Sequence, residues 1–136
     1  MSNCIFCKII AGELPCYKVY EDENFLAILD RFPASPGIVL ILTKRHAQDV
    51  FELNEEESTG LMPLAKRIAE KIKSTINPAG INILQNNGEF AGQEISHYHM
   101  HIIPRYRGDG IIFKKPPTDP PLLELEKIAE QLRLYL

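Results

Sequence analysis

The stretch Ser96-His97-Tyr98-His99-Met100-His101-Ile102-Ile103-Pro104 decides the fold and holds three of the chain's four histidines. The histidines alternate with apolar or aromatic residues, which is the period-two pattern of a strand with one buried face. On such a strand the three histidines share one face, and neighbours along it lie about 7 Å apart. The opposite face is expected to pack in the core and consists of Tyr98, Met100 and Ile102.

Three imidazoles on one strand face have two chemical interpretations, and the residues alone leave both open. Histidines two positions apart can share a metal ion if a further ligand comes from elsewhere. Alternatively, a neutral imidazole with a pKa of about 6.5 can attack phosphorus or move a proton at neutral pH. A surface strand that carries histidines by chance is the third alternative. The preceding loop, residues 86–93, is rich in amides and glycine, which suits phosphate binding or, more simply, a turn.

Cys4 and Cys7 form a Cys-x-x-Cys pair near the start of the sequence. The pair is compatible with a redox centre, with half of a zinc site, or with coincidence. A redox motif of this kind lies near a βαβ pattern, and no strand is predicted before this pair. A tetrahedral zinc site needs two further ligands, for which the candidates are His46 and one of the three clustered histidines. Cys16 lacks a partner at ligand spacing and is interpreted as a structural thiol.

Length and composition restrict the class of protein. The length of 136 residues indicates one domain over residues 1–136. The composition, with 45% hydrophobic and 24% charged residues, is ordinary for a globular protein. A net charge of −3 disfavours binding to nucleic-acid polymers or acidic membranes, and no apolar run is long enough to span a bilayer. Three cysteines, an odd number, favour a reducing compartment over a disulfide framework. We therefore expect a soluble cytoplasmic domain.

Hydrophobic periodicity predicts an α+β fold with a mainly antiparallel sheet. The main helix is expected to start after Asn54, because Asn54 can cap it and Glu57 completes a capping box. Pro63 is expected to bend or break this helix, and a C-terminal helix is predicted at about 120–136. Besides the histidine strand, four strands are predicted, at residues 19–21, 25–29, 38–42 and 81–85. The third of these is an unbroken apolar run, which is typical of a central strand.

The run His97-Tyr98-His99-Met100-His101-Ile102-Ile103 resembles the signature of the histidine triad (HIT) superfamily of nucleotide hydrolases and transferases, in which histidines alternate with apolar residues. The similarity extends over about residues 4–107 and includes Cys4-Ile5-Phe6-Cys7-Lys8-Ile9, Lys44-Arg45-His46 and Asn87-Gly88. With its cysteine pair, the chain is most similar to the prokaryotic zinc-containing proteins of the Hint branch. The resemblance implies a HIT-like fold, which has a five-stranded, mainly antiparallel sheet and two helices. It also implies a homodimer in which the sheet continues from one copy into the other.

The resemblance also implies a role for each residue of the site. His99 corresponds to the nucleophile that attacks an α-phosphate and forms a covalent nucleotidyl-histidine, and His101 to a residue that binds phosphate and assists the leaving group. The nucleotide-binding residues that it implies are Asp30 at the ribose, Asn86 and Gln93 at the phosphate, and Glu94, together with His99 and His101. The implied ligands of a structural zinc are Cys4, Cys7, His46 and His97.

The activity implied by the resemblance is hydrolysis of purine nucleotide phosphoramidates or related nucleotide esters at the α-phosphate. The alternatives are a dinucleoside polyphosphate hydrolase of the Fhit type, a nucleotide-binding or interaction module with little catalysis, and a metal hydrolase that uses all three histidines. Three positions depart from the family pattern. Ile38 stands where the family commonly has a histidine, and Thr43 stands where it usually has a proline. Glu94 stands where many Hint proteins have a serine that helps the leaving group. A carboxylate at Glu94 is expected to repel a polyphosphate or to act as an acid.

Overall fold

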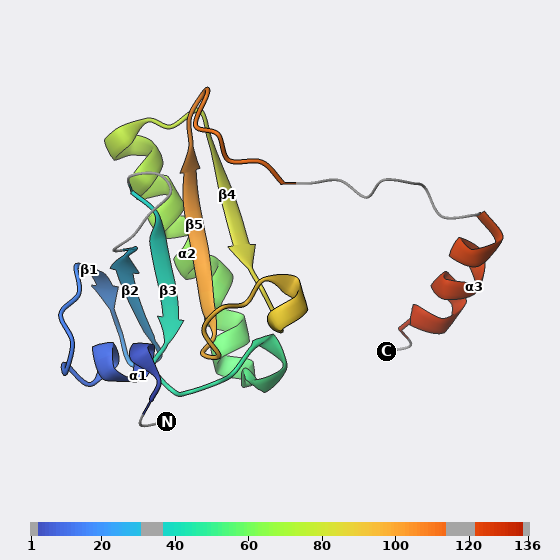
Figure 1. Cartoon of the computed structure of the whole chain (residues 1–136), viewed down its shortest axis with the longest axis horizontal. Helices are drawn as coiled ribbons and strands as arrows, with labels where there is room; N and C mark the ends of the chain where they lie inside the picture. The colour runs from blue at the N-terminus through green and yellow to red at the C-terminus, as the bar shows by residue number, and fades with distance from the viewer. Residues whose placement is uncertain (1–2, 31–36, 114–121, 135–136) are drawn as a thin grey trace.

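A five-stranded antiparallel sheet forms the centre of the molecule, in the order β1-β2-β3-β5-β4 (Figure 1). The computed structural model describes residues 3–30, 37–113 and 122–134. The predicted α+β class and the central place of the third strand are confirmed. In chain order the elements are α1 (Ile5–Ile10), β1 (Lys18–Glu21), β2 (Phe25–Leu29), β3 (Val39–Thr43), the 3-10 turn η1 (Val50–Glu52), α2 (Glu55–Ile76), β4 (Gly80–Gln85), the 3-10 turn η2 (Glu89–Ala91), β5 (His99–Arg105) and α3 (Leu122–Leu132).

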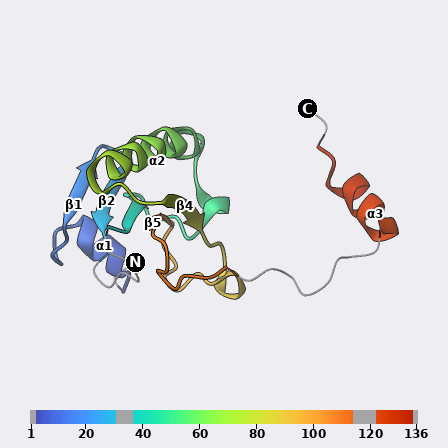
Figure 2. The same ribbon diagram turned by 90° about the horizontal axis from the view of Figure 1, so that it is seen from above.

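The two faces of the sheet carry different layers, and this separation creates the site. Helix α2 lies along one face and the short helix α1 on the other (Figure 2). Tyr98, Met100 and Ile102 pack with α2 in the larger core cluster, as expected. Since side chains alternate along a strand, His99 and His101 face the side of α1.

The histidine strand starts later than its alternation suggests. β5 begins at His99, because the Tyr98 N–H donates to the Ala47 carbonyl, at 2.6 Å, instead of joining the ladder with β3. His97 therefore lies in a bend before the strand. It still lies on the α1 side, where the Phe6 ring contacts both His97 and His99 edge-on.

Helix α2 confirms one expectation and corrects another. Asn54 caps the helix and exchanges both bonds of a capping box with Glu57. The helix runs unbroken through Pro63, so the predicted break is wrong. Pro63 lies on the exposed face, where water can satisfy the carbonyl that its missing N–H leaves unpaired, while buried residues on both sides of it hold the helix on the sheet.

Two short helices complete the described structure. Residues 5–10 form α1, whose N-cap is Cys4. The predicted C-terminal helix is present as α3, and residues 120–121 and 135–136 of its expected span lie outside the described residues. Helix α3 stands apart from the sheet (Figures 1 and 2), and the side chains of residues 124–134 are exposed. Within the described ranges, no helix is long and apolar enough to cross a membrane.

Candidate functional site: a Cys2His2 cluster beside a histidine-lined pocket

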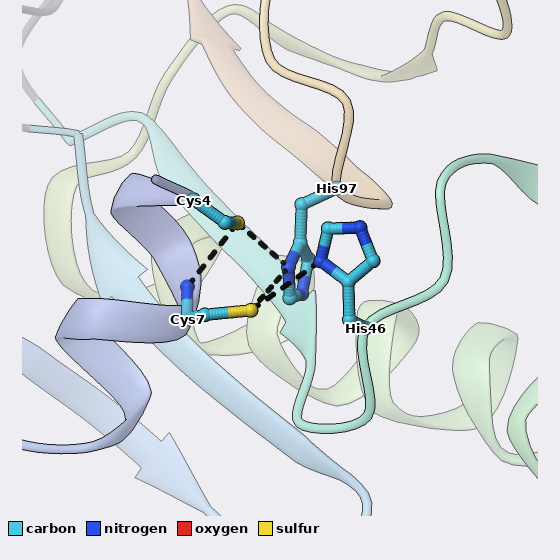
Figure 3. Close-up of side chains that lie close together, drawn as sticks. All are labelled: Cys4, Cys7, His46 and His97. Atoms are coloured by element: carbon cyan, nitrogen blue, oxygen red, sulfur yellow. Dashed lines mark hydrogen bonds between the residues drawn. The ribbon is translucent and has the colours of Figure 1, made fainter. Parts of the chain in front are cut away.

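Two cysteines and two histidines from distant parts of the chain meet beside the start of β5 (Figure 3). Cys4 and Cys7 belong to the first turn of α1, where the Cys4 sulfur accepts the Cys7 N–H at 3.4 Å. His46 follows β3, and His97 precedes β5. One ligand atom from each residue lies within 4.8 Å of all the others. These are the four residues expected as zinc ligands, and no other such group is found in the described part of the chain.

The spacing of the ligand atoms fits a tetrahedral metal ion. The His97 Nδ1 is 3.3 Å from the Cys4 Sγ and 3.5 Å from the Cys7 Sγ, and the His46 Nδ1 is 3.3 Å from the Cys7 Sγ. Ligand bonds of about 2.3 Å to sulfur and about 2.0 Å to nitrogen at a tetrahedral angle give sulfur–nitrogen separations of about 3.5 Å. Two thiolates and two imidazoles are a common ligand set for structural zinc.

His97 is wholly buried, and its hydrogen bonds determine which ring nitrogen can bind a metal. Its Nε2 lies 2.7 Å from the Thr43 carbonyl, which can only accept, so Nε2 carries the proton. The unprotonated Nδ1 then faces the cysteines. Burial lowers the pKa of His97, which favours the neutral ring that a metal ligand requires. Thr43, the strand residue that provides this carbonyl, was not recognised as important from the sequence.

His99 is held through the backbone of His97. The His99 Nδ1–H donates to the His97 carbonyl at 2.7 Å, which leaves Nε2 with a lone pair. Burial lowers the pKa of His99, an effect that its bond to His97 partly opposes, and this favours the neutral ring. The His101 ring lies 5.0 Å from that of His99, and its Nδ1 is buried without a partner among the described residues.

A pocket of about 740 Å³ opens in front of these two histidines. Its volume is within the range of about 300–1,000 Å³ that is usual for small-molecule sites. One side is apolar and comes from α1, β2 and β3, with Phe6, Leu29 and Leu40 among its residues. The other side comes from β4, β5 and the η2 loop and combines polar residues with apolar ones such as Leu84. The pocket brings together five of the six residues expected to bind nucleotide: Asp30, Asn86, Glu94, His99 and His101.

Gln93, the sixth, has its carboxamide engaged with backbone groups. Its Oε1 accepts the Gly88 N–H at 2.8 Å, and its Nε2 donates to the carbonyls of Gln48 and Ile95. It is not among the residues that line the pocket. Gln93 thereby joins the η2 loop to the segment before η1.

Phe6 is the residue of the site whose position the sequence reasoning missed. Its ring is 4% exposed and lies with its centroid 5.8 Å from that of His97 and 5.0 Å from that of His99. It also lines the pocket. The available signal was its place between Cys4 and Cys7, because a helix that brings two cysteines to one metal carries the intervening side chain to the same region.

Comparison with known proteins agrees with this geometry. The family model described as "HIT domain" matches residues 11–108. The chain is 38% identical to adenosine 5'-monophosphoramidase hnt1 of Schizosaccharomyces pombe, over 96% of each protein. The crystal structure of a HIT family protein from Bacillus subtilis aligns with a TM-score of 0.88 at 42% identity, covering 98% of this chain and 99% of that one.

A second solved structure bears on the cysteine–histidine cluster. It is a histidine triad family protein from Mycobacterium smegmatis described as zinc-bound, and it aligns with a TM-score of 0.76 at 36% identity over 86% of this chain and 85% of that one. A family model that spans most of the chain, relatives at more than a third identity, and a fold shared along almost the whole length lead to one conclusion. The chain belongs to the HIT family, as its histidine pattern indicated.

Proposed function

We propose that the protein hydrolyses purine nucleotide phosphoramidates, or related nucleotide esters, at the α-phosphate. The observation that carries this proposal is the 2.7 Å bond from the His99 Nδ1–H to the His97 carbonyl, which leaves a neutral Nε2 lone pair beside the pocket. A phosphoramidase from fission yeast is similar over almost the entire chain, which favours this reaction over others that an activated imidazole can perform.

The reaction proceeds in two displacements. The His99 Nε2 lone pair forms a bond to phosphorus, and the P–N bond breaks with its electron pair passing to the amine nitrogen, which takes up a proton. Water then attacks the phosphorus of the nucleotidyl-histidine and gives up a proton to solvent. The bond from phosphorus to His99 breaks with its electron pair returning to Nε2, which releases the nucleoside monophosphate and restores the free imidazole. His101, 5.0 Å from His99 between ring centroids, supports the phosphate oxygens and the departing amine.

The two sides of the pocket suit the two ends of a nucleotide. The apolar side, with Phe6 and Leu29, is suited to the purine base, and the Asp30 carboxylate can accept bonds from ribose hydroxyls. Asn86 offers an amide to the phosphate. Since the Gln93 carboxamide is occupied by the backbone, we propose that it serves the phosphate indirectly, by holding the η2 loop in place.

Cys4, Cys7, His46 and His97 would hold a structural zinc ion. Bound there, zinc would supply a fixed link between α1 and the segments after β3 and before β5 that carry the imidazoles. The protein's own contribution is the orientation of His97 by Thr43, which presents Nδ1 to the site. His99 and His101 lie outside this cluster, which argues against a hydrolase with a metal on all three histidines.

The exposed edge strand β4 and helix α2 are the proposed surface for a homodimer. Between them lies a hollow of about 690 Å³, lined by apolar residues such as Met62 and Ile83, which are 54% and 41% exposed. An unpaired strand edge next to apolar surface favours continuation of the sheet into a second copy.

Ile83→Glu should give a monomer by light scattering, while Val19→Glu on the opposite edge strand β1 should leave the dimer intact. A dimer that survives Ile83→Glu contradicts this surface.

The activity is tested by incubating the zinc-loaded protein with adenosine 5'-phosphoramidate and following release of AMP. Rapid acid quench followed by peptide mass spectrometry should find the adenylyl group on His99. Diadenosine polyphosphates are compared at the same concentration. Faster cleavage of the polyphosphates would establish the Fhit-type alternative, and binding of AMP without turnover of either substrate would establish a binding module.

A further inference from the structure

The pocket has an unusual charge for a site that binds phosphates. Asp30 and Glu94 both line it, and among the described residues no lysine or arginine does. Proteins that bind polyphosphates surround them with lysine, arginine or a metal ion. The polar atoms of the described lining come instead from amides, imidazoles and carboxylates.

Glu94 lines the pocket on the side that β4 and the η2 loop form. Together with Asn86 and Gly92 it belongs to the segments on either side of η2, whereas the apolar side is formed by α1 and the neighbouring strands. A nucleotide with its base against Phe6 and its α-phosphate at His99 directs its leaving group away from the apolar side. The leaving group therefore approaches Glu94.

The Glu94 carboxylate is available to a ligand. Its side chain is exposed, and it makes no ion pair or hydrogen bond with any other described residue. Glu94 and His99 line the same pocket. The Glu94 charge therefore acts on a group attached to the phosphorus that His99 attacks.

Resting on the proposed function, we propose that Glu94 makes this site selective for phosphoramidates whose leaving amine carries a second, positively charged group. Diamines and basic amino-acid esters, joined through one nitrogen to the α-phosphate, are the substrate class with this chemistry. The cation pairs with Glu94 while the linked nitrogen leaves from phosphorus. The same carboxylate repels the phosphate chain of a dinucleoside polyphosphate.

The test uses three adenosine 5'-phosphoramidates of equal chain length that end in an ammonium, a methyl or a carboxylate group. For the wild-type protein, kcat/KM should be about fivefold higher for the ammonium than for the methyl compound, which is the upper range for a partly solvated ion pair. The carboxylate compound should be about fivefold slower than the methyl compound. The difference should shrink in 0.5 M salt, where exposed charges are screened beyond about 4–5 Å.

Two variants isolate the charge, and a third serves as control. Glu94→Gln should bring the three rates to within about twofold of one another, and Glu94→Lys should reverse the order. Glu89→Gln changes an exposed glutamate on η2 that does not line the pocket, so it should keep the wild-type order. Circular dichroism and zinc content establish that each variant is folded.

The outcomes separate the two proposals. Turnover of the methyl compound with no preference among the three, or a preference that Glu94→Lys leaves unchanged, overturns the role of Glu94 while the phosphoramidase activity stands. Absence of turnover of all three compounds by folded, zinc-loaded protein overturns the activity and the selectivity together. An order that reverses in Glu94→Lys supports both.

Discussion

The cysteine–histidine cluster contains His97 and the pocket contains His99, so the two sites share neighbouring positions of one segment. They are nevertheless built in opposite ways. In the cluster, the four ligand atoms face one another within 4.8 Å, and His97 is wholly buried. In the pocket, His99 faces about 740 Å³ of open space. The same residue type thus serves a closed site, where protein atoms surround the imidazole nitrogen, and an open one, where a nitrogen is left for a substrate.

The difference shows how the two sites depend on each other. The His97 side chain belongs to the cluster, while its carbonyl orients His99 at 2.7 Å. Phe6 contacts both rings. The cluster can therefore hold His99 in position although its ligand atoms do not include those of His99. Each variant below should affect one site more than the other.

The largest expected effect is on the open site alone. His99→Ala removes the nucleophile, so kcat for adenosine phosphoramidate should fall by about 10⁴-fold or more. Zinc content and melting temperature should stay close to those of the wild type, because His99 is not among the four ligands. Turnover near the wild-type rate would falsify the covalent mechanism.

A double change in the closed site comes second. Cys4→Ala with Cys7→Ala should abolish zinc binding and remove about 3 kcal/mol of unfolding free energy when free zinc is about a hundredfold above its Kd. Because His97 still precedes His99, activity should drop by only about 10–100-fold, as for other groups that orient a functional ligand. Metal analysis and thermal unfolding measure this, with Cys16→Ala as the control that keeps its zinc. A full zinc equivalent in the double variant contradicts the ligand assignment.

The contact between the two sites is probed by Phe6→Leu. A swap of similar apolar size in a packed core costs about 1 kcal/mol of unfolding free energy. We expect zinc to be retained and KM for the nucleotide to rise, since the ring also lines the pocket. Denaturant unfolding and steady-state kinetics are the measurements. Loss of zinc with an unchanged KM would instead assign Phe6 to the cluster.

The smallest effect concerns the ribose. Asp30→Asn should raise KM about fivefold, or about 1 kcal/mol, because a neutral amide oxygen accepts a weaker hydrogen bond than a carboxylate does. The values of kcat and the zinc content should be unchanged. The variant and the wild type should bind a 2',3'-dideoxy substrate equally, because the hydroxyls are then absent. An Asp30→Asn effect that persists with this substrate places the carboxylate elsewhere.

Local sequence patterns anticipated much of the fold. Alternation of apolar residues located the strands, and the Asn54 and Glu57 pair located the start of α2, because both depend on contacts between residues close in the chain. The break expected at Pro63 does not occur. Pro63 is exposed to solvent, and the local sequence pattern did not show this. The start of β5 at His99 depends on a bond to Ala47, fifty-one positions before Tyr98, and local pattern could not supply it.

The sequence by itself determined the kinds of chemistry available, three clustered histidines and a cysteine pair, and through their resemblance the family. Read as residues alone, it left the histidines equivalent, since alternate positions on a strand differ in no local property. Only the tertiary structure made them unequal. Folding brings Cys4 and Cys7 to His97, turns the His97 carbonyl to His99, and leaves Glu94 facing the pocket, because distances between residues ninety positions apart are decided by packing.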